Sequence, residues 1–482
     1  MIIHVLGQIL LIEAALMLLP CITALCFGEA QIKYFLVTMG LLALTGGLFI
    51  LLPVTDRRIY YKDGFAIVSI GWVVMSLFGA LPFYLSGEIP SYLDALFETV
   101  SGFTTTGASI LNDVEVLSRC MLFWRSFTHW IGGMGVLVFL TALIPAAAGG
   151  ALNLMRAESP GVEVEKLVPK SRHTAVILYG IYVFLTLLQL VLMLAGKMPF
   201  FDALTVTFGT AGTGGFGVLN TSVASYSPYI QTVITVFLVL FGINFNLYFL
   251  LLCKKFRDVL RSEELKVYLI IFFAAVGFIA VDLYACRVYG TLTEAIHQSA
   301  FQVSSLMSTA GFSTADFNTW PEVSRIFLLL VMCVGGCAGS TAGGLKVSRV
   351  IIIFKSAMSE LKRVVSPRRV NVVKYDGKRV KDDVVRISNA YIVIYVAIIA
   401  LSVVILSFDK MDFITNFSGT VATFNNVGPG FGAVGPAGNY SLYSPVSKTV
   451  FIFDMLLGRL EIFPILVVIS SVLHKKSKKS SL

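Results

Sequence analysis

The stretch Ser101-Gly102-Phe103-Thr104-Thr105-Thr106-Gly107-Ala108-Ser109 decides the fold, because three related stretches follow it along the chain. These are Thr213-Gly214-Gly215-Phe216-Gly217, Thr309-Ala310-Gly311-Phe312-Ser313 and Asn426-Val427-Gly428-Pro429-Gly430. They recur roughly every 100 residues, each between an amphipathic stretch and a long apolar run. Glycine permits backbone conformations that other residues resist. Four such glycine segments in phase therefore predict one repeated piece of irregular backbone.

The composition places this backbone in a membrane. Of the 482 residues, 56% are hydrophobic and 13% are charged, and the mean hydropathy is +0.84. Such values exclude a soluble globular domain and a disordered chain. Runs long enough to cross a bilayer lie near residues 2–26, 33–53, 65–86, 121–145, 174–196, 228–253, 266–286, 323–354, 388–408 and 446–472. The sequence therefore predicts an all-α integral membrane protein with about ten transmembrane helices.

A shorter, half-apolar stretch precedes each glycine segment, near residues 93–104, 201–211, 296–308 and 413–424. These stretches are too short to cross a bilayer. At membrane depth, irregular backbone is tolerated only where protein buries it or where it lines a watery cavity. Each short stretch with its glycine segment is therefore predicted to form a pore helix followed by a re-entrant pore loop.

The expected order is span, pore helix, glycine segment and span, four times over. Asp94 and Asp202 support the register, because each precedes its central glycine, Gly107 or Gly215, by 13 positions. The predicted parts are two N-terminal transmembrane helices in 1–56, repeat 1 in 57–155, repeat 2 in 156–262, repeat 3 in 263–365, and repeat 4 with a cytoplasmic C-terminal tail in 366–482.

Lysine and arginine gather in alternate loops. Of the 37 such residues, 26 lie in the segments 54–64, 146–172, 254–266, 355–387 and 473–482. With ten spans these segments share one side, which the positive-inside rule assigns to the cytoplasm together with both termini. Topology and anionic lipid heads explain the net charge of +9, so no nucleic-acid partner is expected. The segment 355–387 is either a partner-docking surface or a solvated loop that sets the topology.

The glycine segments are the candidate ion site. A cation in a narrow pore loses hydration water, which backbone carbonyls can replace, and threonine hydroxyls can add ligands at the inner end. The predicted filter residues are Thr105, Thr106, Gly107, Thr213, Gly214, Gly215, Thr309, Ala310, Gly311, Asn426, Val427 and Gly428. Tight turns or close helix contacts would account for one such segment, but they account less well for four in phase.

These segments resemble those of the Trk/Ktr/HKT superfamily of potassium transporters, most closely the bacterial Trk-type membrane subunit. The resemblance covers nearly the whole chain and rests on residues 101–107, 212–217, 308–312 and 425–430. It implies potassium uptake across the cell inner membrane, four repeats around one pore, and pairing of two chains as a homodimer. It also implies gating by a cytosolic, TrkA-like nucleotide-binding subunit, which would dock on loops including 355–387. Potassium would be the transported ion, and no organic cofactor is expected.

The central residues of the four glycine segments, Gly107, Gly215, Gly311 and Gly428, bear on selectivity. In the plant branch of the superfamily, serine at the first central position accompanies sodium transport. All four positions here are glycine, which favours potassium. The residues that follow are Ala108, Phe216, Phe312 and Pro429, so the tyrosine ring of potassium channels is missing and we expect fewer well-formed ion sites.

A further glycine-rich stretch, residues 335–344, interrupts the run 323–354. Its five glycines should break the helix, because each costs roughly 1 kcal/mol relative to alanine. The resemblance implies a loop that blocks the pore below the filter, and an arginine of the last span that limits flux. The predicted gate residues are Gly335, Gly336, Gly339, Ser340, Thr341, Gly343, Gly344, Lys346 and Arg459. Helix packing through small residues, snorkelling of Lys346, and an ion pair of Arg459 with Glu461 or Asp454 remain open.

Two other classes of function compete with a potassium channel. A secondary symporter that couples potassium to protons or sodium would have inverted repeats, whereas these repeats run in one direction. A membrane-embedded enzyme would need clustered Asp, His or Glu at a membrane face. The sequence has no such cluster, so we expect a protein that is not an enzyme. Arg125, His129 and Glu13, in or near spans, are interpreted as interhelical pairs.

Overall fold

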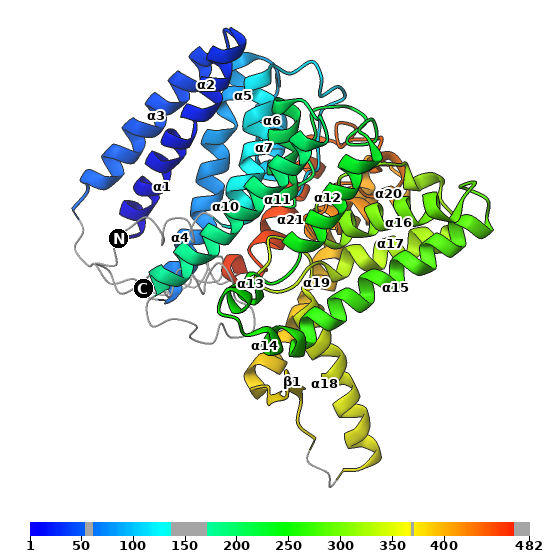
Figure 1. The fold of residues 1–482 in the computed structure, drawn as a ribbon. Coiled ribbons are helices and arrows are strands. Elements are labelled where there is room, and N and C mark those ends of the chain that lie inside the picture. The colour runs from blue at the N-terminus through cyan, green and yellow to red at the C-terminus, as the bar shows by residue number, and fades with distance from the viewer. Residues whose placement is uncertain (54–60, 136–170, 368–370, 467–482) are drawn as a thin grey trace.

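The computed structural model is built almost entirely from helices, as predicted (Figure 1). It describes residues 1–53, 61–135, 171–367 and 371–466. Within these ranges the strands are β1 (Lys374–Tyr375) and β2 (Lys378–Arg379), which pair antiparallel. The ends of the predicted spans 121–145 and 446–472, most of the basic segment 146–172 and all of 473–482 lie outside the described residues.

The N-terminal helices lie side by side at one edge of the molecule (Figure 1). The first run is broken into α1 (Ile2–Leu16) and α2 (Leu18–Phe27). Pro20 explains the break, because it lacks an N–H and its ring would clash with the carbonyl of Leu16. α3 (Ile32–Leu51) packs along α1.

Each repeat then contains an outer helix, a pore helix and an inner helix, in the predicted order. The outer helices are α4 (Tyr61–Gly79), which α5 (Leu81–Ser86) continues, α10 (Ser171–Ala195), α15 (Glu263–Ala285) and α19 (Asp382–Leu406). The pore helices are α6 (Tyr92–Phe103), α11 (Phe200–Ala211), α16 (Leu292–Met307) and α20 (Phe413–Phe424). The inner helices are α7 (Arg119–Gly133), α12 (Pro228–Phe241), α17 (Glu322–Val334) and α21 (Pro445–Arg459). Short connecting elements are α14 (Phe256–Arg261), η1 (Phe317–Thr319), η2 (Ser407–Asp409) and η3 (Gly432–Val434).

Two inner spans are broken. The prediction of one continuous span over 228–253 was wrong, because the chain bends by 89° between α12 and α13 (Phe245–Leu252). The run 323–354 breaks at its glycines, as predicted, and resumes as α18 (Val347–Val365). α18 extends away from the helical bundle (Figure 1).

The two breaks support each other. The N–H of Cys337 donates to the carbonyl of Gly242 at 2.9 Å. The hydroxyl of Thr341 donates to the carbonyl of Phe241 at 3.2 Å. These donors pair carbonyls at the end of α12, where the helical hydrogen bonds stop. The bend in one inner span therefore depends on a loop about 100 residues later in the chain.

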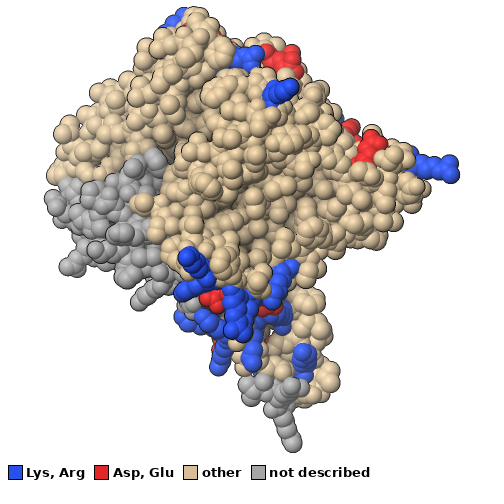
Figure 2. All heavy atoms as spheres, viewed as in Figure 1, with Lys and Arg blue, Asp and Glu red and all other residues tan. Residues whose placement is uncertain are grey.

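Two of the ten predicted spans, 121–145 and 446–472, continue outside the described residues. Among the described residues, six helices are long and apolar enough to cross a membrane, or seven if the bent pair α12 and α13 counts as one. The visible face has a wide uncharged band, with Lys and Arg gathered below it around α14, β1 and α18 (Figure 2). Such a band between charged ends is typical of a multi-pass membrane protein.

Gly46 offers a test of the packing between α1 and α3. A Cβ on Gly46 would lie 2.9 Å from the carbonyl oxygen of Gly7. Gly46→Leu is therefore expected to cost about 1–3 kcal/mol by overpacking and to lower the unfolding temperature measured in detergent. Gly47→Leu is the control, because a Cβ on Gly47 meets no atom within 4 Å. Equal unfolding temperatures for the two variants would contradict this packing.

Candidate functional site

The four glycine segments leave their pore helices in one shared conformation. Each pore helix ends two residues before a residue with positive φ: Thr105 (56°), Thr213 (54°), Thr309 (60°) and Asn426 (56°). Each of these residues donates its N–H to the carbonyl three positions back, and the following residue donates to the carbonyl five positions back. This is the Schellman closure of a helix. The predicted repeat is therefore present at the level of individual hydrogen bonds.

Threonine is an unusual choice at this position. A positive φ is an outlier for a β-branched residue and costs of order 1–3 kcal/mol. The hydrogen bonds of the threonine side chains explain why threonine occupies this position. The Thr309 hydroxyl accepts from the N–H of Gly343 at 2.6 Å, and the Thr105 hydroxyl accepts from Nη1 of Arg459 at 3.2 Å. The strain thus keeps a side-chain oxygen at the inner end of the segment.

The other two segments use their side chains differently. The Thr213 hydroxyl donates to the carbonyl of Gly212 at 2.6 Å. Asn426 donates from Nδ2 to the hydroxyl of Thr106 at 3.0 Å and to the carbonyl of Met455 at 2.9 Å. The fourth segment is therefore tied directly to the first.

The central glycines bring the segments together in a closed ring. Their φ values are 78° at Gly107, 81° at Gly215, 79° at Gly311 and 95° at Gly428. A Cβ built on each would collide with a carbonyl oxygen of the next segment: Gly214 for Gly107 (1.9 Å), Ala310 for Gly215 (1.9 Å), Val427 for Gly311 (2.0 Å) and Thr106 for Gly428 (2.6 Å). The fourth contact returns to the first segment. Only glycine permits this approach of four backbones.

The ring is suited to a cation. In each segment the residues with positive φ flank one with ordinary φ, an alternation that lets successive carbonyls face one side. Each pore helix also ends at the ring, so its C-terminal partial negative charge lies there. Beyond the central glycines is a cavity of about 180 Å³, lined in part by residues 434–440. We call this cavity the vestibule; its lining also includes the four central glycines.

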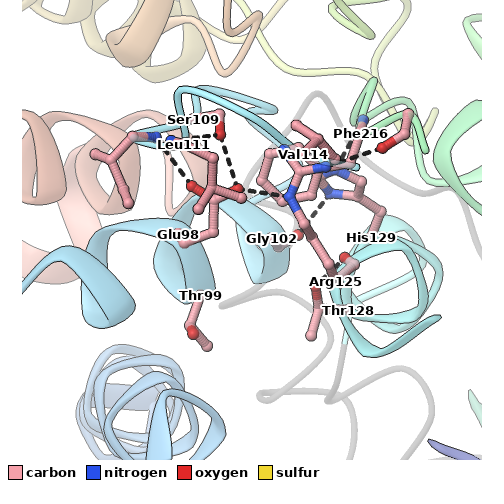
Figure 3. A network of polar contacts seen from close by, with 12 residues as sticks. Glu98, Thr99, Gly102, Ser109, Leu111, Val114, Arg125, Thr128, His129 and Phe216 are labelled. Carbon is pink, nitrogen blue, oxygen red and sulfur yellow. Dashed lines mark hydrogen bonds and ion pairs between the residues drawn. The ribbon is translucent and has the colours of Figure 1, made fainter. Parts of the chain in front are cut away.

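A buried ion pair supports the first segment (Figure 3). Glu98 on α6 and Arg125 on α7 are 2.5 Å apart, and their side chains are 0% and 4% exposed. The Glu98 carboxylate also accepts from the Ser109 hydroxyl and from the N–H of Ile110, both at 3.0 Å. Glu98 therefore holds the backbone that follows Gly107.

The same helix, α7, contacts the second segment. Nη1 of Arg125 donates to the carbonyl of Gly217 at 3.0 Å, and its guanidinium carbon lies 3.5 Å from the ring centroid of Phe216. One turn later, Nδ1 of His129 donates to the carbonyl of Gly102 at 2.8 Å. Nε2 of His129 accepts from the N–H of Phe216 at 3.3 Å, which assigns the neutral tautomer. α7 thus joins the first segment to the second (Figure 3).

These contacts confirm the interhelical interpretation of Arg125 and His129. The interpretation was wrong for Glu13, whose buried carboxylate has no hydrogen-bond partner among the described residues. The role of Glu98 was not predicted from the sequence. Its signal was an acidic residue in a half-apolar helix, nine positions before Gly107.

All of the predicted gate residues except Arg459 lie in a loop beneath the ring. We call residues 335–346, between α17 and α18, the glycine loop. Its Gly335, Gly339 and Gly344 have positive φ, between 70° and 79°. A Cβ on Gly343 would lie 2.4 Å from the carbonyl oxygen of Asn425, next to the fourth glycine segment. The loop therefore packs directly against the base of the ring.

Contacts within the loop and to α13 fix its path. The carbonyl of Gly336 accepts from the N–H of Val347 at 3.0 Å, and that of Gly339 accepts from the N–H of Phe245 at 3.0 Å. Ser340 donates its hydroxyl to the carbonyl of Cys337 at 2.6 Å. Lys346 is buried, and its ammonium donates to the carbonyl of Ala342. Snorkelling of Lys346 to the membrane surface is therefore excluded.

Arg459 joins the ring to the loop. Besides its bond to Thr105, Nη1 donates to the carbonyl of Thr341 at 2.9 Å. Nη2 donates to the carbonyl of Gly133 at 2.9 Å and to that of Gly132. One guanidinium thus links the first glycine segment, the glycine loop and the end of α7.

The acidic residues considered as partners of Arg459 have other contacts. Glu461 forms an ion pair with Arg349 of α18 at 2.6 Å. Asp454 accepts a hydrogen bond from the Ser402 hydroxyl at 2.9 Å. The hydrogen bonds of Arg459 described above go to carbonyl and hydroxyl oxygens beneath the ring.

Comparisons with known proteins agree with this geometry. The family model TrkH, described as a cation transport protein, matches residues 33–481. The chain belongs to the TrkH family. The Trk system potassium uptake protein TrkH of Salmonella typhimurium is 35% identical to this TrkH-family chain over 473 residues, 96% of this chain and 97% of the relative. The TrkH of Halomonas elongata is 34% identical over 99% of both.

A solved structure extends the likeness to the fold of the TrkH-family chain. The crystal structure of the potassium transporter TrkH from Vibrio parahaemolyticus superposes with a TM-score of 0.87. The two are 31% identical, and the match covers 97% of each chain. The resemblance drawn from the glycine segments is therefore confirmed.

The Glu98–Arg125 pair makes a stability prediction for this TrkH-family chain. Arg125→Gln leaves a buried carboxylate uncompensated, which typically costs about 3–5 kcal/mol. We expect a lower unfolding temperature in detergent, partly restored in the double variant Glu98→Gln/Arg125→Gln, because that variant has no stranded charge. A double variant as unstable as the sum of the two single variants would show that the groups do not interact.

Proposed function

We propose that this chain takes up potassium across the cell inner membrane through a central pore, with the ring of glycine segments as its selectivity filter. The relatives described above are named as potassium uptake proteins and a potassium transporter. The observation that carries the proposal is the closed ring, in which no central glycine leaves room for a Cβ beside the next segment's carbonyl. Such carbonyls can replace the water that a cation sheds.

The ligands in this proposal are the carbonyl oxygens of Thr106, Gly214, Ala310 and Val427. They belong to uncharged backbone, which suits a weakly hydrated monovalent cation that must enter and leave quickly. The hydroxyls of Thr105, Thr213 and Thr309 lie at the inner end. Ions would reach the ring through the vestibule from outside the cell.

The glycine loop and Arg459 would form the gate. The loop packs against Asn425 and Thr309 at the base of the ring, where it obstructs passage toward the cytoplasm. Opening would require Gly343 to move away from Thr309. Arg459 would add electrostatic repulsion below the filter.

Two features of the surface support proposals about regulation and assembly. Exposed basic residues lie in segments 254–261 and 355–381, and the positive-inside rule assigns this end to the cytoplasm. A cytosolic nucleotide-binding subunit would dock there. Exposed apolar residues of α18, including Phe354, Leu361 and Val365, would suit burial against a second chain in a homodimer.

Uptake of labelled rubidium by proteoliposomes, with sodium as competitor, tests the proposed activity. We expect uptake down a cation gradient that excess potassium abolishes and equal sodium barely reduces. Equal competition by the two ions would contradict the filter.

Gly107→Ser tests the ring. Its side chain would meet the carbonyl oxygen of Gly214 at 1.9 Å, so the ring must deform and the preference for potassium over sodium should fall. Gly87→Ser is a matched control, because Gly87 also has a positive φ (79°) but a Cβ there meets no atom within 4 Å. An unchanged potassium-to-sodium ratio in a well-expressed Gly107→Ser protein would show that Gly107 does not shape the filter.

Arg459→Ala tests the electrostatic barrier. At an effective dielectric of about 20 and a distance of about 8 Å, a fixed charge raises the energy of a cation by roughly 2 kcal/mol. Removing it should raise the current by up to about thirtyfold with selectivity unchanged, while Arg459→Lys should stay close to wild type. Normal expression with wild-type current in Arg459→Ala would refute the barrier.

A further inference from the structure

The carboxylate of Glu264 links the glycine loop to the first turn of α18. Glu264 lies in the first turn of α15 and is 3% exposed. Its Oε1 accepts from the N–H of Ala338 at 2.7 Å and from the N–H of Ser348 at 3.1 Å. Hydrogen bonds to an ionised acceptor are about twice as strong as neutral ones. Gly343 lies in the chain between these two bonded residues, Ala338 and Ser348, and contacts the ring through Thr309.

The preceding residue, Glu263, is tied to a hairpin on the basic side of the molecule. β1 and β2 are joined by Asp376 and Gly377, whose φ values are 49° and 77°, as in the Asp-Gly turns that favour hairpins. Oδ1 of Asp376 accepts from the N–H of Glu263 at 2.7 Å, and Oε2 of Glu263 accepts from the N–H of Asp376 at 3.2 Å.

α18 contributes to the same junction. Lys355 forms an ion pair with Glu263. Its ammonium also donates to the carbonyl of Lys374 at 2.8 Å. The hairpin, the start of α15 and the helix that follows the glycine loop therefore meet at Glu263, beside the carboxylate that holds the loop.

We propose that Glu264 is the positioning residue that keeps the glycine loop closed, and that the hairpin of residues 374–379 controls it through Glu263. Displacement of the hairpin shifts the first turn of α15, because Asp376 and Glu263 hold each other by two hydrogen bonds. The Glu264 carboxylate then leaves Ala338 and Ser348, and the loop is free to withdraw from Thr309. This inference rests on the proposed function of the ring and the loop.

The hairpin carries exposed basic side chains that a partner protein could bind. Lys374, Lys378 and Arg379 are exposed, and the hairpin meets the start of α15 within the basic region (Figures 1 and 2). An acidic surface of a cytosolic protein fits this charge. Binding there would act on the loop without touching the ring, so it would change the flux and not the selectivity.

The first test uses the full chain alone in proteoliposomes. Glu264→Ala should raise labelled-rubidium uptake about tenfold, the change in open-to-closed ratio expected when a charge-assisted hydrogen bond is lost. The rubidium-to-sodium ratio should stay at the wild-type value. Glu360→Ala is the control, because Glu360 is an exposed acidic residue of α18 that pairs with Arg363 of its own helix. If Glu264→Ala does not fold, Glu264→Gln should show a smaller rise at the same selectivity.

A chemical probe reports the loop directly. Cys337 lies in the loop and is 0% exposed. In a chain whose other six cysteines are replaced, a membrane-impermeant thiol reagent should modify Cys337 faster in Glu264→Ala than in the parent. Equal modification rates, or uptake no higher than wild type in a folded Glu264 variant, would overturn the inference.

The coupling to the hairpin has its own test. Glu263→Ala should also raise uptake, and combining it with Glu264→Ala should give no further rise, because both break one connection. If the rise in uptake of the double variant equals the product of the two single rises, the coupling is overturned. If neither wild type nor any variant takes up rubidium, the proposed function fails; if wild type does and Glu264→Ala does not exceed it, only this inference fails.

Discussion

There is no room for a Cβ atom where the four glycine segments meet. At Gly107 and Gly215 the added atom would lie 1.9 Å from a carbonyl oxygen of the next segment. Backbones that approach so closely must be positioned accurately. The same helix closure in all four segments positions them, at Thr105, Thr213, Thr309 and Asn426. The pore helices and the strained threonines hold the four backbones in this ring, and the vestibule lies next to it.

Two arginines, Arg125 and Arg459, contact the segments of this ring. Arg125 is neutralised by Glu98 and packs on Phe216, so it fastens two segments without leaving an unpaired ion. The contacts of Arg459 include four oxygens of described residues beneath the ring. The first charge therefore joins two segments of the ring, whereas the second lies beneath the ring, on the proposed path of the cation.

Much of this arrangement could be predicted from the sequence. The glycine segments, their pore helices and the break at residues 335–344 are encoded locally, through glycine content, segment length and repeated spacing. The bend after Phe241 could not be predicted, because the hydrogen-bond donors that stabilise it come from Cys337 and Thr341, far along the chain. The role of Glu98 depends in the same way on Arg125, which only the fold brings to it. The Thr105 hydroxyl was expected at the inner end, but its strained backbone could be recognised only in three dimensions.

The most direct test of the central claim is to locate the ion. Crystals grown with rubidium in place of potassium would be measured at the rubidium absorption edge. We expect an anomalous peak on the pore axis, within coordination distance of the carbonyl oxygens of Thr106, Gly214, Ala310 and Val427, that is absent from crystals grown in sodium. A peak held by side chains elsewhere, or no peak within the ring, would contradict it.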